Sequence, residues 1–210
     1  MDLYNDVNDW LLVGGDLSLA SALLGQTDED TIAHLMGRGV THVLDARIEW
    51  EDSALWIAEG LYAENYAHLP ITDSWKHNPD EEWFCGVEDF VRNFLAERKD
   101  GEKIYVHCHM GVNRGPSAAM LALLTEEPTM TPWHAFLAVR AARSVAGLVY
   151  AEHVGVRHIV RNTTDDEITW ATLGDFRKQM NDYWTPSLIR AVNKGISFYR
   201  STEGDTRIEV

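Results

Sequence analysis

The chain has 210 residues, 45% of them hydrophobic, which is enough to build a folded core and excludes global disorder. Its formal net charge of −15 excludes the lysine and arginine clusters that nucleic acids and anionic membranes require, so we expect neither as a partner. Two cysteines cannot form a disulfide framework, and the sequence has neither an apolar run of about 18 residues nor an N-terminal signal pattern, which predicts a soluble, cytoplasmic protein.

The first part of the chain alternates short apolar runs with segments of helical character. Strands are predicted over residues 10–16, 40–44 and 66–71, the first ending in a glycine turn. Helices are predicted over residues 17–24 and 31–38. A short polar side chain just before the second helix, Thr27 or Asp28, could cap its free N–H groups.

The second part continues the alternation. Helices are predicted over residues 83–98, 117–124 and 132–143, and a strand over residues 104–106. Residues 165–200 carry apolar side chains at helical spacing, with a break expected near Pro186.

Strands that alternate with helices indicate an α/β fold, with a central and mainly parallel sheet that helices cover on both faces. We expect one compact domain over residues 1–160 and a helical C-terminal extension, residues 161–210, packed on it.

The turn between strand 104–106 and helix 117–124 carries the strongest functional signal. Cys108 is followed after five residues by Arg114, with Gly111 between them. Backbone N–H groups point into such a turn beside the positive end of the helix dipole, so it binds tetrahedral oxyanions such as phosphate. The same field lowers the pKa of a thiol at its base, and the planar fork of arginine grips two phosphate oxygens. The turn therefore predicts a nucleophile, an anion cradle and a charge clamp.

Cleavage of a phosphate ester by a cysteine also needs an acid for the leaving oxygen and a base for the attacking water. Asp73 is the best candidate because it follows a predicted strand, and functional groups gather beyond the carboxyl ends of strands in α/β sheets. Three acidic residues on the same segment are rivals that better fit the start of a helix. They are Asp80, Glu81 and Glu82.

These residues resemble the protein tyrosine phosphatase superfamily, and most of all its compact dual-specificity branch, over about residues 8–160. The resemblance implies that Cys108 is the nucleophile, Arg114 the phosphate clamp and Asp73 the general acid and base. It makes His107 the histidine that orders the loop and lowers the thiol pKa. The other loop residues would surround the phosphate with backbone N–H groups: His109, Met110, Gly111, Val112 and Asn113. No metal and no cofactor is expected.

The sequence departs from the family at Gly115, where a serine or threonine usually helps the thiolate to leave. We therefore expect slow hydrolysis of the phosphocysteine intermediate, visible as a burst before slow turnover. Cys85 is expected in the core, with a disulfide to Cys108 left open as an alternative. Arg140 and Arg143 are expected on a solvated helix face.

The expected reaction is hydrolysis of phosphomonoesters, phosphotyrosine and also phosphoserine or phosphothreonine, on a phosphorylated protein. No lysine occupies the variable loop positions, which disfavours inositol lipids. Three alternatives stay open: a phosphate-binding module with little turnover, a phosphatase of a non-protein substrate such as a phosphoglucan, and a rhodanese-like sulfurtransferase. The oligomeric state is left undecided.

Overall fold

The computed structural model describes residues 4–74, 77–164, 166–184, 188–190 and 193. The strands are β1 (Tyr4–Asp6), β2 (Leu11–Gly14), β3 (Val40–Asp45), β4 (Tyr66–His68) and β5 (Lys103–His107). The helices are α1 (Leu17–Leu24), α2 (Asp28–Gly37), α3 (Ser53–Ala58), α4 (Glu81–Glu97), α5 (Arg114–Glu126), α6 (Pro132–Ala142), α7 (Ala151–Asn162) and α8 (Asp166–Tyr183), with a 3-10 turn, η1 (Ala63–Asn65). The predicted break at Pro186 and residues 194–200 of the predicted helical pattern lie outside the described residues.

Within the described part of the chain the strands form one five-stranded sheet in the order β1-β2-β5-β3-β4. Strand β5 pairs in parallel with β2 on one side and with β3 on the other, and β3 pairs in parallel with β4. Only the edge strand β1 runs antiparallel. The predicted α/β fold with a mainly parallel sheet is confirmed, and the loop that follows β5 leaves from the middle of the sheet.

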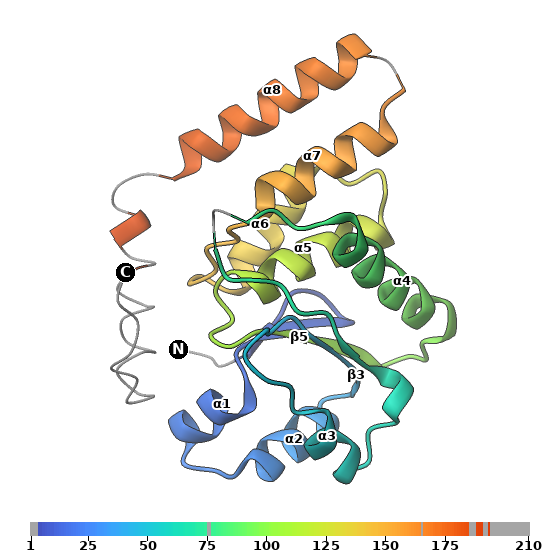
Figure 1. The fold of residues 1–210 in the computed structure, drawn as a ribbon, viewed down its shortest axis with the longest axis vertical. Helices are drawn as coiled ribbons and strands as arrows, with labels where there is room; N and C mark the ends of the chain where they lie inside the picture. The colour runs from blue at the N-terminus through green and yellow to red at the C-terminus, as the bar shows by residue number, and fades with distance from the viewer. Residues whose placement is uncertain (1–3, 75–76, 165, 185–187, 191–192, 194–210) are drawn as a thin grey trace.

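Side chains alternate between two cores because successive residues of a strand point to opposite faces. Helices α1 to α3 cover one face of the sheet and α4 to α6 cover the other, with α7 and α8 stacked outside them (Figure 1). The first core contains Leu12, Ile32, Leu35, Val43, Trp56 and Tyr105. The second contains Leu11, Val13, Val106, Phe84, Val87, Phe94, Met120 and Phe136.

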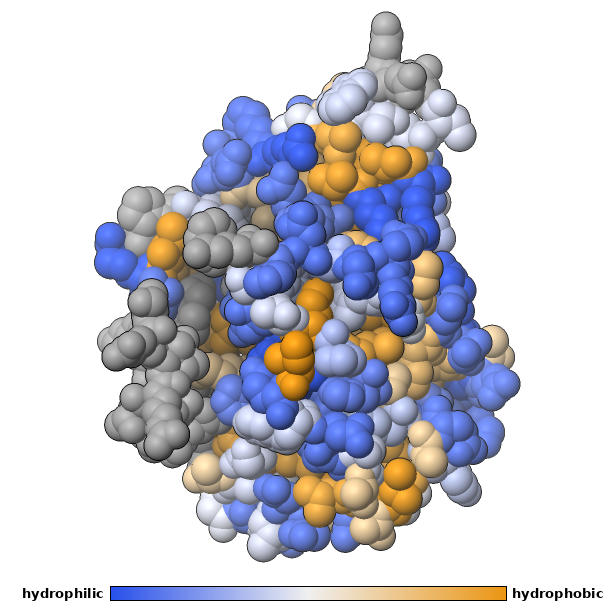
Figure 2. All heavy atoms as spheres, viewed as in Figure 1, coloured by the Kyte–Doolittle hydropathy of each residue, from blue (hydrophilic) through white to orange (hydrophobic). Residues whose placement is uncertain are grey.

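The outer surface is mostly hydrophilic on the face drawn in Figure 2, with small hydrophobic patches between the polar residues. Of the described helices, none is at once long and apolar enough to cross a membrane.

Several element boundaries differ from the sequence prediction, and three of the differences have a clear local reason. Helix α2 begins at Asp28 because the Thr27 hydroxyl accepts the N–H of Asp30 and the Asp30 side chain accepts the N–H of Thr27. Strand β4 stops at His68 because Pro70, which has no N–H, follows two residues later. Helix α5 begins at Arg114 rather than after Pro116, so the Cys108 turn passes directly into it.

The sequence prediction missed β1, α3, η1 and α7. Helix α7 is unexpected because Gly155 stands in its middle, and glycine weakens a helix interior. A Cβ at Gly155 would lie 2.2 Å from the Phe176 ring of α8, so the glycine lets these helices approach closely. The division of the chain at residue 160 stays a prediction.

Candidate active site

Cys108 and Arg114 stand at the two ends of the turn between β5 and α5, and both side chains are buried. We call residues 108–113 the Cys108 loop. Because β5 lies in the middle of the sheet, this loop sits at the carboxyl edge of its parallel strands, flanked by the segments that follow β2, β3 and β4. These are the segments that can bring further functional groups to it.

Five backbone carbonyls of the Cys108 loop, those of residues 109–113, are bound by donors outside the loop. The carbonyl of His109 accepts the N–H of Asp16 at 3.0 Å. The carbonyls of Met110 and Gly111 accept N–H groups of the Arg143 guanidinium. This side chain was expected in solvent, but it is buried. The carbonyl of Val112 accepts the N–H of Gly147 at 2.7 Å, and the carbonyl of Asn113 accepts the N–H of Ser117 at 3.0 Å.

Carbonyls that point outward turn their neighbouring N–H groups inward. Among the described residues no acceptor faces the N–H groups of residues 110–113. Gly111 completes the turn with a φ of +62°, and a Cβ there would lie 2.4 Å from the Gly14 carbonyl. The loop therefore offers a cradle of unpaired donors, the kind of arrangement that binds oxyanions in proteins.

Arg114 is oriented by a residue that the sequence analysis did not consider. Its two terminal nitrogens donate to the two carboxylate oxygens of Glu49, at 2.7 and 2.8 Å, from the loop after β3. Burial lowers the pKa of Arg114, but the facing Glu49 and other acidic groups raise it above its usual value. Glu49 occupies the end of the fork, whereas the buried Nε at its side edge makes no hydrogen bond to any described residue. An oxyanion in the cradle can bind that edge.

Asp73 lies beside the same arginine. Its carboxylate accepts the side-chain amide of Asn113 at 3.2 Å and is 3.7 Å from Arg114 Nε. The structure thus brings Asp73 to the Cys108 loop. Of the rivals, Asp80 caps α4 and Glu81 pairs with Arg157 and Arg161 of α7. Glu82 belongs to the same first turn of α4.

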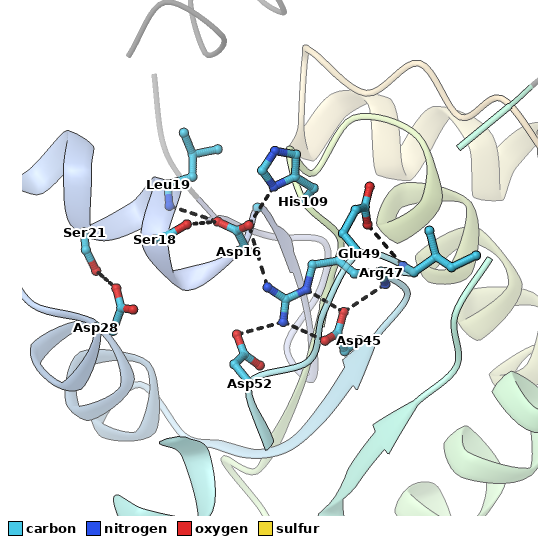
Figure 3. Close-up of polar contacts among 12 residues, drawn as sticks. Asp16, Ser18, Leu19, Ser21, Asp28, Asp45, Arg47, Glu49, Asp52 and His109 are labelled. Atoms are coloured by element: carbon cyan, nitrogen blue, oxygen red, sulfur yellow. Dashed lines mark hydrogen bonds and ion pairs between the residues drawn. The ribbon is translucent and has the colours of Figure 1, made fainter. Parts of the chain in front are cut away.

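A buried ion cluster supports the loop from the β2 and β3 side. Arg47 is 1% exposed, and its guanidinium pairs with Asp45 at 2.6 Å, Asp52 at 2.8 Å and Asp16 at 3.7 Å. Figure 3 shows this guanidinium between the three carboxylates. Burial raises the pKa of Asp45 while the neighbouring His107 and Arg47 lower it, and the balance leaves it at about 2. Asp45 therefore stays ionised at neutral pH.

His107 ends β5 with its ring fully buried and stacked on Tyr105 at 5.1 Å. Burial lowers its pKa more than Asp45 and Asp52 raise it, so the ring is neutral at pH 7. Its ring nitrogens have no hydrogen-bond partner in the described part of the chain. Ligand atoms of His107 and the two carboxylates lie within 4.8 Å of one another, but Arg47 already binds both carboxylates and supplies the positive charge there.

His109 is held at the edge of the Cys108 loop by Asp16 and Trp50. Its Nδ1 pairs with the buried carboxylate of Asp16 at 2.7 Å, and its ring meets Trp50 edge-on at 5.2 Å. Figure 3 shows the ring above Asp16, on the side of the Arg47 cluster that faces the Cys108 loop. Trp50 in turn covers Arg47, 5.5 Å from its ring centre. An aromatic and imidazole rim thus flanks the cradle.

Two further expectations concern Gly115 and Cys85. A Cβ at position 115 would lie 3.1 Å from the Cys108 backbone nitrogen, which is a tight contact, so the glycine lets α5 pack closely under the loop. Cys85 and Cys108 are both free in this structure. Cys85 lies on α4 near Glu81 and Arg157 and is half-buried, rather than in the core as expected.

Arg47, Glu49 and Asp16 are the functional residues that the sequence analysis missed. All follow β2 or β3, and the rule that selected Asp73, a polar residue beyond the carboxyl end of a strand, applies equally to them. The sequence does hold that signal, although it does not indicate which carboxylate pairs with which arginine.

The structure has the fold of the protein tyrosine phosphatases and dual-specificity phosphatases among the solved structures. Among solved structures, Cydia pomonella PTP-2 phosphatase is similar with a TM-score of 0.56 at 18% identity, over 74% of this chain and 89% of that one. Tk-PTP in its active form has a TM-score of 0.55 at 15% identity, over 72% of this chain and 92% of that one. Human DUSP28 has a TM-score of 0.51 at 15% identity, over 86% of this chain and 97% of that one. No protein-family model and no curated protein matches the sequence.

Proposed function

We propose that this protein is a metal-independent phosphatase that hydrolyses phosphomonoesters through a phosphocysteine intermediate. The observation that carries the proposal is the arrangement around Arg114. Glu49 holds the end of its fork, Nε and the N–H groups of residues 110–113 have no hydrogen-bond acceptor among the described residues, and Asp73 stands beside it.

In the proposed first step the Cys108 thiolate attacks phosphorus and the ester P–O bond breaks. Asp73 gives its proton to the leaving oxygen, while Arg114 and the loop N–H groups bind the three equatorial oxygens, where the charge remains. In the second step Asp73, now a carboxylate, takes a proton from water as that water attacks the phosphocysteine. The S–P bond breaks, and phosphate and thiolate are released.

We expect a phosphorylated protein as the substrate, in a reducing compartment such as the cytoplasm, because the thiol must stay reduced. We propose residues 161–210 as a helical extension of the catalytic domain. Gly115 favours a second candidate, a phosphate-binding module with little turnover, because no hydroxyl at this position can assist release of the thiolate.

Asp73→Asn tests the proposal with para-nitrophenyl phosphate as substrate. Loss of a general acid is expected to lower turnover by about 10²–10⁴-fold. Asp80→Asn is the matched control: it changes a carboxylate on the same segment that only caps α4. If the wild type releases no nitrophenol but binds inorganic phosphate, the protein is the binding module; turnover of thiosulfate with cyanide would identify a sulfurtransferase.

Glu49→Gln tests the orientation of the clamp. The amide keeps the shape of the side chain but loses the charge that pairs with Arg114, and hydrogen bonds to charged groups contribute about 1.5–3 kcal/mol, which corresponds to a loss of kcat/KM of about 10–100-fold. Glu51→Gln, an exposed carboxylate of the same loop that faces His68, is the control and should keep full activity. Faster turnover of Glu49→Gln would contradict this role, because it would mean that the Glu49 carboxylate competes with phosphate for Arg114.

A further inference from the structure

Tyr150 is a buried tyrosine outside the catalytic groups named so far, and its hydroxyl reaches the segment that carries Asp73. It directly precedes α7, on a segment that returns from α6 past the Cys108 loop. We call residues 69–74 the Asp73 loop.

The Tyr150 hydroxyl binds the backbone on both sides of Asp73. The hydroxyl donates to the carbonyl of Thr72, and the carbonyl of Ser74, 3.1 Å away, is a second acceptor for the same proton. The hydroxyl oxygen in turn accepts the N–H of Ser74 at 3.3 Å. A hydroxyl can donate once and accept twice, so this one group uses both capacities on the same short loop. Burial raises the pKa of Tyr150, so the hydroxyl keeps its proton at neutral pH.

The same residue is also tied to the Cys108 loop. Its backbone N–H donates to the Ser117 hydroxyl at 3.3 Å, and that hydroxyl donates to the Asn113 carbonyl at 2.7 Å. The preceding residues Gly147 and Leu148 donate to the Val112 carbonyl. Tyr150 therefore joins two loops that lie far apart in the sequence, one with the acid and one with the nucleophile.

The strand end and α4 secure the start of the Asp73 loop, and Tyr150 binds its tip. Leu69 binds β3 through its N–H and the Trp83 indole through its carbonyl, and Ile71 binds Ala46. Beyond Ile71 the Tyr150 hydroxyl binds Thr72 and Ser74, and the Ser74 carbonyl also accepts the N–H of His77 at 3.1 Å. Tyr150 therefore binds the backbone on both sides of Asp73, whose carboxylate itself contacts Asn113 and Arg114.

We propose that Tyr150 is a positioning residue, whose hydroxyl holds the Asp73 loop over the Cys108 loop so that Asp73 can protonate the leaving oxygen. This inference rests on the proposed phosphatase function and on Asp73 as its acid. It predicts that the hydroxyl affects only the step in which the leaving group needs a proton.

Tyr150→Phe tests it, because the variant keeps the buried ring and removes one oxygen. The leaving group of phenyl phosphate is about as basic as the tyrosine side chain, with a pKa of about 10, so its departure needs a proton from the acid. Dinitrophenyl phosphate releases dinitrophenolate, a stable anion that departs without a proton. We expect kcat/KM for phenyl phosphate to fall about 10–100-fold and that for dinitrophenyl phosphate to change by less than about twofold. The N–H of Ser74 should also exchange with solvent faster.

Tyr183→Phe is the control, since it removes a phenol oxygen that binds Arg140 on α6, and both substrates should react as in the wild type. An equal loss with both substrates in Tyr150→Phe would overturn the inference, since it would show a general structural role. Asp73→Asn, assayed in parallel, separates the two failures: if it shows no dependence on the leaving group, the assignment of the acid is wrong, whatever Tyr150→Phe does.

Discussion

Cys108→Ser is expected to abolish hydrolysis of para-nitrophenyl phosphate, with a loss of about 10⁴-fold or more, the scale seen when an enzyme loses its nucleophile. A serine hydroxyl ionises far less readily than a thiol, and a hydroxyl nucleophile needs a neighbouring base. The substitution changes one atom in a buried side chain, so the outward-bound carbonyls and inward N–H groups of the loop should persist.

Two measurements on Cys108→Ser distinguish lost chemistry from a lost fold. Turnover should disappear, while inorganic phosphate should still bind in a calorimetric titration, because the cradle and Arg114 remain. Cys85→Ser is the matched control: this cysteine lies on α4, away from the loop, and its loss should leave turnover unchanged. Residual activity of Cys108→Ser near the wild-type rate would exclude a phosphocysteine.

Arg47→Leu is expected to lower the free energy of unfolding by about 3–5 kcal/mol, the usual cost of removing one partner from a buried ion cluster. It leaves Asp16, Asp45 and Asp52 without their shared cation in a site that excludes water. Denaturant unfolding at pH 7 measures the loss. Arg38→Leu, which breaks a partly exposed pair with Asp6, is the control and should cost less than about 1 kcal/mol.

The pH dependence of Arg47→Leu provides a second readout. In the wild type the pKa of Asp45 is lowered to about 2, so its ion pair stabilises the fold above the ordinary pKa of 3.8 and loses this contribution as the pH falls through about 2. In the variant the buried carboxylates have lost their cation, so binding protons stabilises the folded state. The difference in the free energy of unfolding between wild type and variant should therefore shrink on going from pH 7 to pH 3. A difference independent of pH would mean that lost packing, and not charge, causes the effect.

The sequence predicts the parts of this molecule that rest on local patterns. The parallel sheet follows from apolar runs that alternate with amphipathic segments, and the cradle follows from a strand, a glycine turn and a helix in close succession. Asp73 could be selected because strand ends in α/β folds meet at one edge. Each of these inferences needs only neighbouring residues and one rule of topology.

The pairings across the site could not be predicted in the same way. Glu49 and Glu51 are equivalent in sequence, yet only Glu49 meets the fork of Arg114. Arg143 was expected on a solvated helix face, where most helix charges lie, but it is buried and binds the loop carbonyls, which need donors. Which polar groups meet depends on how the loops turn in three dimensions, and spacing along the chain does not encode that.

Gly111 is constrained by two neighbours at once, and this limits how the protein can change. Besides the Gly14 carbonyl at 2.4 Å, a Cβ at this position would meet the Arg143 guanidinium at 2.7 Å. A single substitution at Gly111 therefore disturbs the end of β2 and the arginine that binds the loop carbonyls, and relief at one neighbour leaves the clash with the other. Any alternative residue would have to arise together with changes in two distant segments, so substitutions accepted one at a time cannot readily pass through this position.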